Sequence, residues 1–369
     1  MDTSRNAIVI HSPHSGRSAQ LGDALTHLRE AGIEITEVIS IADLDGLPAQ
    51  GARWQQDGIG VVIAAGGDGL IGGVITHIVE SGLPLGILPL GTANDIARSL
   101  RIPQDLLQAV QVIANGAIIE TDIGVARPSE QAPHLASKGQ KNPVLTRVSS
   151  HKHGYFAHTV TIGLNVQFAR IATNVATRQR YGRFTYPVAA LETLKYHDAL
   201  DITLQFEGLV LPQNGKPAPK LSDGAAEPNI LHCRALQITV INAPIFGGQW
   251  NLSIPGASIN DHLLDIVVVE QIEFARLNQA LAHFLGIQSK GEYIPAANEY
   301  TPAWTRHPAD LSNIPGLHHM QAKGVFITTN ADPRDVTLDG EVRGQTPMYV
   351  HLAQERLRVI VPAPAGTAG

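Results

Sequence analysis

The stretch from Val61 to Leu100 decides the fold, and it reads VVIAAGGDGLIGGVITHIVESGLPLGILPLGTANDIARSL. It starts with an unbroken apolar run, which is typical of a parallel strand covered by helices on both faces. Apolar side chains then recur at helical spacing over residues 71–81, and a second apolar strand follows at residues 85–88. Because each strand leads into a glycine-containing turn, the stretch predicts a strand–helix–strand unit with two glycine loops.

The same alternation of strand and helix patterns extends over the first part of the chain. These patterns predict strands at residues 7–10, 33–38, 59–65, 85–88 and 117–123, and helices at residues 20–31, 71–81 and 105–114. Such an alternation indicates a doubly wound α/β domain, which we place at residues 1–124. Ligands of such sheets bind at the C-terminal edge of the strands.

The remaining sequence has a different texture, with apolar runs separated by few helical patterns. The runs predict strands at residues 155–162, 200–206, 235–241, 263–269, 325–329 and 357–361, and the helical patterns lie at residues 184–196 and 274–286. We therefore expect a mostly β, sandwich-like domain at residues 125–369. Long polar loops are expected within it at residues 127–153, 211–232 and 290–323.

Composition excludes several classes of protein. Of the 369 residues, 44% are hydrophobic and 16% are charged, so the chain can bury a sizeable core, and its length favours two domains. The formal net charge of −6 argues against a nucleic-acid partner bound through bulk electrostatics. The single cysteine, Cys233, excludes an internal disulfide framework and fits a reducing compartment. No apolar run approaches the ~20 residues of a membrane span or resembles a signal peptide, so we expect a cytoplasmic protein.

The first glycine loop can hold a phosphate. A strand that ends in Gly66-Gly67-Asp68-Gly69 and opens a helix leaves several backbone N–H groups pointing into one concavity. A carboxylate beside phosphates is repulsive unless a cation intervenes, so Asp68 indicates Mg²⁺-nucleotide chemistry. Alternatively, the loop is a tight strand–helix turn in which Asp68 caps the helix.

The second glycine loop, Gly91-Thr92-Ala93-Asn94-Asp95, follows the next strand and opens another helix. Adjacent parallel strands deliver their loops to the same edge of the sheet, so the hydroxyl, amide and carboxylate groups of this loop should face the first loop. Either Asn94 or Asp95 can instead serve as a helix N-cap.

Other phosphate-binding loops fit less well. A Walker A loop requires a lysine, and neither glycine loop contains one. Residues 67–72 satisfy G-x-G-x-x-G, but they follow the third strand, and the next strand ends without an acidic residue to bind a ribose. The turn after the first strand reaches the same sheet edge and makes Arg17 available for phosphate.

Five motifs in order resemble those of the diacylglycerol kinase catalytic domain, and nearly the whole chain is similar to soluble bacterial lipid kinases of the DgkB and YegS kind. The matching motifs lie at residues 66–69 (GGDG), 89–98 (PLGTANDIAR), 242–248 (NAPIFGG), 255–265 (PGASINDHLLD) and 338–341 (LDGE). The resemblance implies a nucleotide-binding domain like those of phosphofructokinase and NAD kinase, followed by a β-rich domain that helps to form a lipid-accepting cleft.

The resemblance also implies site residues. Positions that contact nucleotide in the family are Ser40, Gly66, Gly67, Asp68, Gly69, Leu70, Ile71, Gly72, Thr92 and Asn94. Glu341 falls on the family's proposed proton acceptor and, with Asp68, on its catalytic positions. Ser258, Asp261 and Leu263 fall on a Mg²⁺ site thought to be structural or regulatory.

The implied function is an ATP- and Mg²⁺-dependent lipid kinase that phosphorylates the hydroxyl of a diacylglycerol-like or other lipid alcohol. Peripheral membrane contact follows from such a substrate, and basic and aromatic side chains at residues 178–195 can dock anionic headgroups or simply be solvated. A homodimer is possible by the same resemblance. The alternatives are an NAD kinase-type phosphotransferase and a non-catalytic protein that binds nucleotide or lipid.

The first loop departs from the family pattern G-G-D-G-T-x-N-E-V. Leu70, Gly72 and Gly73 stand at the Thr, Asn and Glu positions, and His262 replaces a glycine in the expected metal turn. We expect these changes to affect the catalytic rate rather than the fold.

Overall fold

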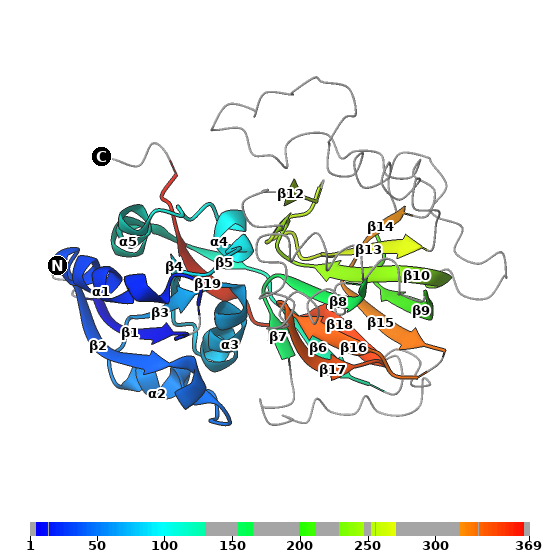
Figure 1. The fold of residues 1–369 in the computed structure, drawn as a ribbon, viewed down its shortest axis with the longest axis horizontal. Coiled ribbons are helices and arrows are strands. Elements are labelled where there is room, and N and C mark those ends of the chain that lie inside the picture. The colour runs from blue at the N-terminus through cyan, green and yellow to red at the C-terminus, as the bar shows by residue number, and fades with distance from the viewer. Residues whose placement is uncertain are drawn as a thin grey trace, which may run out of the picture.

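Figure 1 shows two lobes, one built from helices and a first sheet and the other from a second, larger sheet. The computed structural model describes residues 5–13, 15–129, 154–164, 199–210, 229–246, 252–254, 256–270, 317–330 and 332–364. The helices expected at residues 184–196 and 274–286, most of the three expected long loops and the basic cluster at residues 178–195 lie outside these ranges.

Six strands form the first sheet, in the spatial order β2-β1-β3-β4-β19-β5. Their bounds are Arg5–His11 for β1, Ile33–Ser40 for β2, Val61–Gly66 for β3, Leu85–Pro89 for β4, Ala117–Thr121 for β5 and Leu357–Val361 for β19. Strands β1 to β4 are mutually parallel, so their C-terminal ends share one edge. β3 is buried at every position, as its unbroken apolar run predicts.

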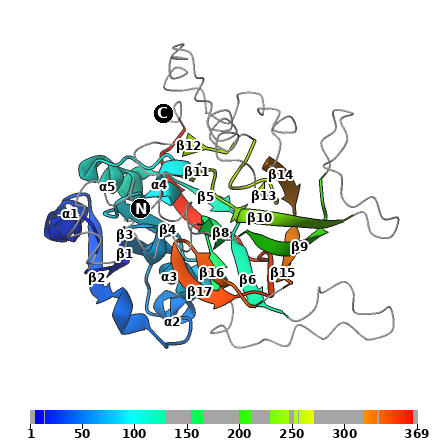
Figure 2. The same cartoon turned by 45° about the vertical axis from the view of Figure 1, so that its right-hand side comes forward.

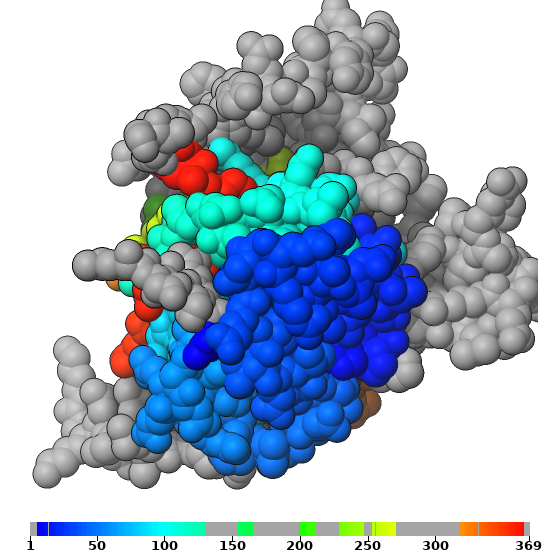
Figure 3. All heavy atoms as spheres, turned by 90° about the vertical axis from the view of Figure 1, so that its left-hand side faces the viewer, coloured from blue at the N-terminus to red at the C-terminus, as the bar shows by residue number. Residues whose placement is uncertain are grey.

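Helices cover both faces of this sheet, which confirms the doubly wound α/β fold (Figure 1). They are α1 Leu21–Glu30, α2 Gly51–Gln56, α3 Asp68–Ile78, α4 Asp95–Ser99 and α5 Leu106–Asn115, with short 3-10 turns η1 Ser18–Gln20, η2 Ile41–Leu44 and η3 Val79–Ser81. α1 packs against α5 and α2 against α3; Figure 3 shows the dark blue N-terminal segments directly beside cyan α5. Among the described residues, no helix has the length and apolarity that crossing a bilayer requires.

Strand β19 lies in the first sheet, although its position late in the chain predicts a place in the β-rich half. It runs antiparallel to β5 along its whole length and pairs with β4 in the parallel direction through Val359 and Leu85. The expected placement is therefore wrong. The apolar run indicates a buried strand, but only the open position between β4 and β5 determines which sheet receives it.

The second lobe is one large, mostly antiparallel sheet, which confirms the β-rich second half. The strand order is β17-β16-β8-β10-β9-β15-β18-β6-β7, and β13 and β14 continue from β10. Bounds are β6 Gly124–Pro128, β7 Gly154–Phe156, β8 Thr159–Gly163, β9 Leu200–Glu207, β10 Ile230–Ile241, β13 Leu264–Glu270, β14 Leu317–Ala322, β15 Gly324–Thr329, β16 Asp335–Leu338, β17 Glu341–Gln345 and β18 Met348–Leu352, with a small pair β11 Ile245–Phe246 and β12 Leu252–Ser253. β9 alternates buried and open positions, because one face covers the core of this lobe.

The two lobes meet along α3 and α4, which contact β7 and β11 respectively (Figure 2). The Ser99 hydroxyl accepts a hydrogen bond from the backbone N–H of Ile245 across this junction. Asn242 is buried there, and its side-chain amide donates to the carbonyls of Asp122 and Ala157. These contacts bring the edge of the first sheet that carries the glycine loops against the second lobe.

Candidate functional site

The two glycine loops touch each other at the edge of the first sheet. A Cβ atom on Gly67 would lie 3.1 Å from the Cα of Gly91, and a Cβ on Gly91 would overlap the backbone of Gly67. Neither loop can carry a side chain at this crossing, which explains glycine at both positions. The expectation that the loops meet at one edge is confirmed.

The first turn of α3 is open for an anion. Gly67 is the N-cap residue and has no side chain that could accept from the first backbone N–H groups, and no other side chain of the described residues is seen to do so. The helix begins when Ile71 N donates to the Gly67 carbonyl, which leaves the N–H groups of residues 68–70 without a helical acceptor. Unpaired N–H groups at the positive end of a helix dipole suit a phosphate.

Asp68 holds the two loops together. Its Oδ2 accepts from the backbone N–H of Asp95 at 3.1 Å, and its Oδ1 accepts from that of Ile96 at 2.8 Å. Asp68 therefore caps a helix, as the simpler sequence interpretation holds, but the helix is α4 rather than its own. The same side chain lines the cavity between the lobes.

Asn94 is used to shape its own loop. It is buried, has a left-handed backbone at φ 57°, and its Oδ1 accepts from Gly91 N at 2.9 Å. Its Nδ2 donates to the carbonyls of Pro89 and Gly91 and to the side chain of Gln104. These bonds occupy the amide inside the loop, so any effect of Asn94 on nucleotide binding acts through the backbone that it positions.

The other residues expected on the nucleotide side lie along the same sheet edge. Ser40 ends β2 opposite His11 of β1, and exposed Thr92 lies against the turn that contains Gly16. The guanidinium of Arg17 donates to the carbonyls of Pro89 and Gln104, which uses two of its five N–H donors, so its contact with a phosphate stays a prediction.

Glu341 faces the first glycine loop from the second lobe. Its Oε1 would lie 2.9 Å from a Cβ on Gly69, so the carboxylate stands beside the first turn of α3. Its Oε2 accepts from Nε and Nη2 of Arg343, at 3.1 and 2.6 Å. The side chain of Glu341 is 55% exposed, which leaves it accessible to a substrate. Arg343 was not identified from the sequence. Its position two residues after Glu341 on a strand was the available signal, because side chains at this spacing share one face.

The turn before Glu341 contains a buried acid that the sequence analysis did not single out. Asp339 adopts φ 47°, and its carboxylate accepts from the backbone N–H groups of residues 157–159 at 2.9 to 3.0 Å. Burial raises the pKa of Asp339, while His158 and these three N–H groups oppose the rise. The Asp339-Gly340 pair was a usable signal for a tight turn.

Asp339 also explains why a glycine, Gly72, stands in the first loop where the family pattern has a larger residue. A Cβ on Gly72 would lie 2.8 Å from its Oδ2, so the acid occupies the space that a side chain at this position would need. Gly73 is less constrained, because a Cβ there would meet only the flexible end of Ile41 at 3.2 to 3.4 Å.

A cavity of about 310 Å³ lies where these elements meet. It is lined by Asp68, Ala93, Asp95, His158, Thr159, Thr161, Thr337, Asp339 and Gly340. Its acidic wall fits the need of a triphosphate for a divalent cation. Within the described part of the chain no group of three or more His, Cys, Asp or Glu side chains is placed to bind a metal. A Mg²⁺ ion here would therefore depend on phosphate and water oxygens, as this ion commonly does.

The expected second metal site is a compact turn in the second lobe. Leu263 N donates to Asp261 Oδ1 at 3.1 Å, and Ser258 Oγ donates to Asn260. Partial burial, with Asp265 and Asp122 nearby, raises the pKa of Asp261 to about 6. Such an excess of negative charge fits a cation. Two positive groups already contact Asp122, however: His262 at 3.2 Å when protonated and Arg356 at 3.3 Å.

Comparisons with known proteins agree with this geometry. Residues 6–126 match the diacylglycerol kinase catalytic domain, and residues 158–296 match the YegS C-terminal NAD kinase beta sandwich-like domain. A diacylglycerol kinase of Staphylococcus saprophyticus is 26% identical over 363 residues, 97% of this chain and 96% of that protein. One from Staphylococcus aureus strain JH9 is 25% identical over 363 residues, covering 97% and 93%. A diacylglycerol kinase crystal structure from Bacillus anthracis superposes with a TM-score of 0.59 at 18% identity, covering 97% of each chain.

The site consists of glycine loops at the strand edge of an α/β domain and of an acid from the β-rich lobe that faces them. This combination is typical of a phosphotransferase of the kinase class. The two matched domains together span most of the chain. The resemblance to diacylglycerol kinases noted from the motifs is confirmed, and the chain is a phosphotransferase that uses an alcohol as the acceptor of the phosphoryl group.

Proposed function

We propose that the protein is an ATP- and Mg²⁺-dependent lipid kinase that phosphorylates the hydroxyl of a diacylglycerol-like or other lipid alcohol. The observation that carries the proposal is the approach of the Glu341 carboxylate to the uncapped first turn of α3. One group can accept a proton and the other can bind a phosphate, and they lie side by side.

The nucleotide lies on the first lobe in this proposal. The N–H groups at the start of α3 hold the phosphates, and the crossing at Gly67 and Gly91 lets the backbone approach them closely. Ser40 and Thr92 contact the nucleotide from the flanking loops at the same edge. Asp68 keeps the start of α4 in place beside them.

Glu341 is the proton acceptor. The acceptor hydroxyl attacks the terminal phosphorus of ATP, its proton passes to Oε1 of Glu341, and ADP leaves with the bridging oxygen. Arg343 binds Oε2 and so leaves Oε1 as the oxygen that faces α3. Bound Mg²⁺ would offset the charge between the phosphates and the acids of the cavity, chiefly Asp68 and Asp339. Ser258, Asp261 and Leu263 would hold a second, structural Mg²⁺.

The substrate implies where the protein works. A lipid alcohol is presented by a membrane surface, so we infer a cytoplasmic protein that contacts the membrane peripherally. Sedimentation with phospholipid vesicles that contain diacylglycerol tests this contact, and protein that stays in the supernatant would contradict it. A homodimer is part of the same proposal, and a monomer mass by light scattering would exclude it.

The activity is tested with purified protein, γ-labelled ATP, Mg²⁺ and a panel of lipid alcohols in mixed micelles. The label should appear in an organic-phase product and depend on the lipid. Glu341→Gln is the matched control, because it keeps the shape of an exposed side chain and removes the proton acceptor. Equal labelling by this variant would refute the assigned role of Glu341.

One observation favours a second candidate, a protein that binds nucleotide without turnover. Gly72 and Gly73 lack the side chains that the family pattern places in the first loop, and Asp339 fills part of that space. ATP would then raise the melting temperature while no panel lipid is labelled. Labelling of NAD in place of any lipid would instead support an NAD kinase-type activity.

A further inference from the structure

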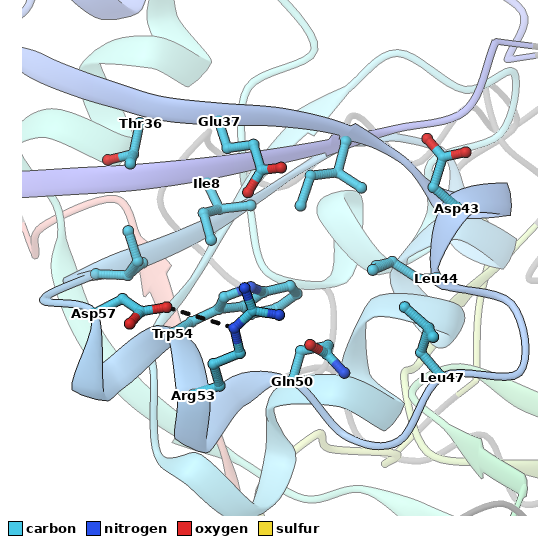
Figure 4. A pocket seen from close by; sticks show the side chains of 12 residues that line it. Ile8, Thr36, Glu37, Asp43, Leu44, Leu47, Gln50, Arg53, Trp54 and Asp57 are labelled. Atoms are coloured by element: carbon cyan, nitrogen blue, oxygen red, sulfur yellow. Dashed lines mark ion pairs between the residues drawn. The ribbon is translucent and has the colours of Figure 1, made fainter.

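A second cavity lies in the first lobe and shares no lining residue with the cavity between the lobes (Figure 4). It measures about 260 Å³ and opens between β2, the turn η2 and α2. Its lining residues are Ile8, Thr36, Glu37, Ile39, Asp43, Leu44, Leu47, Gln50, Arg53, Trp54, Asp57 and Ile59. The volume corresponds to about nine water molecules, so an organic occupant has on the order of nine non-hydrogen atoms.

The cavity combines an apolar floor with an acidic rim. Buried Ile8, Trp54 and Ile59 contribute to the floor. Glu37 and Asp43 stand on the rim, and neither has an ion-pair partner among the described residues (Figure 4). A cavity with an apolar floor and a carboxylate at its rim favours a ligand with an apolar body and a positive group.

The one guanidinium of the rim does not neutralise these acids. Arg53 lies 3.7 Å from Asp57, one helical turn away, and the side chains are 76% and 60% exposed. Three carboxylates and one guanidinium line the cavity, so three negative charges against one positive charge leave a net charge of −2. The exposed ion pair between Arg53 and Asp57 is weak, and it provides no positive charge to compensate Glu37 and Asp43.

Gln50 adds an acceptor on the cavity wall. Its side chain is only 9% exposed, and its Nε2 donates to the Pro48 carbonyl at 2.7 Å. No described group donates to its Oε1, and this oxygen is not among the fully buried atoms without a partner, so water or a ligand in the cavity can reach it. A ligand that carries N–H donors would satisfy this oxygen.

We propose that this cavity binds a small organic cation, an ammonium group on an apolar body of about nine atoms. The ammonium group donates to Gln50 Oε1 and to the Glu37 or Asp43 carboxylate, and the apolar body covers Ile8 and Trp54. An anion meets two unpaired acids, and a neutral alcohol of the same shape leaves them unpaired. The cavity therefore selects on charge. This site is separate from the proposed kinase chemistry and does not depend on it.

The test uses three probes of similar size, benzylamine, benzyl alcohol and benzoate, added to the protein and followed by ligand-observed NMR. Benzylamine should bind saturably, and the other two probes should bind at least about tenfold more weakly. Glu37→Gln and Asp43→Asn should each weaken benzylamine binding by up to about tenfold, because each removes one charged acceptor.

Glu34→Gln is the matched control, since it removes the same charge from the same strand but outside the cavity lining. It should leave benzylamine binding unchanged, and the melting temperature of all three variants without ligand checks that they fold. Equal binding of the three probes, absence of saturable benzylamine binding, or equal weakening by the control and cavity variants would each overturn the proposal.

Discussion

Replacing Asp68 with alanine tests whether this acid is a structural clamp as well as part of a chemical site. The change removes an acceptor from two backbone N–H groups at the start of α4, at 3.1 and 2.8 Å. Each bond to a charged acceptor contributes about 1.5–3 kcal/mol. Because water from the neighbouring cavity can replace part of both bonds, we expect Asp68→Ala to lower the free energy of unfolding by about 2–4 kcal/mol.

Asp105→Ala is the matched control for this change. Asp105 also caps a helix through its side chain, but it does so with one bond of 3.0 Å to Gln108 N at an exposed position. Its removal should cost about 1 kcal/mol and leave nucleotide binding unchanged.

Thermal unfolding by circular dichroism separates the two variants, and ATP-dependent stabilisation is measured on the same samples. At roughly 2–4 °C per kcal/mol, Asp68→Ala should melt roughly 5–15 °C below the parent protein and Asp105→Ala roughly 2–4 °C below it. An Asp68→Ala protein that loses activity yet melts with the parent protein would refute the clamp, and would leave a purely chemical role for Asp68.

Three further predictions follow from the site. Gly72→Ala should lower stability by about 1–3 kcal/mol, because its Cβ would stand 2.8 Å from the tied carboxylate of Asp339, whereas Gly73→Ala should be neutral or stabilising; chemical denaturation compares the two, and equal effects would contradict the packing argument. Glu341→Gln should lower kcat by about 10²–10⁴-fold without changing the melting temperature, since the side chain is exposed; a shifted melting temperature would count against a purely catalytic effect. Mg²⁺ at a hundredfold excess over its Kd should stabilise the protein by about 2.7 kcal/mol in a thermal titration, and Asp261→Asn should abolish this gain; a gain that this variant keeps would contradict the second metal site.

Local patterns were sufficient for much of the fold. The unbroken apolar run of β3 and the helical spacing of α3 correspond to buried elements at the expected places. The order of the strands predicted that both glycine loops reach one edge of the sheet, and the loops do cross there at Gly67 and Gly91. These features depend on neighbouring residues, which is why a sequence window can predict them.

Contacts between distant segments could not be predicted in the same way. The acceptors on Asp68 bind N–H groups 27 and 28 residues further along the chain, and those on Asp339 bind N–H groups about 180 residues back. None of these hydrogen bonds produces a periodic pattern of residues in the sequence. Arg17 illustrates the same limit, since its two carbonyl partners, the end of β4 and the segment before α5, are more than seventy residues away.

The placement of β19 has a consequence for biosynthesis. Residues 357–361 fill the position between β4 and β5, so the ribosome must synthesise and release the chain through residue 361 before the nucleotide lobe can close. Until then β4 and β5 each present an unsatisfied backbone edge to the crowded surroundings of the nascent chain. Cleaving the chain after residue 124 would leave the same gap, and such a fragment should aggregate rather than fold.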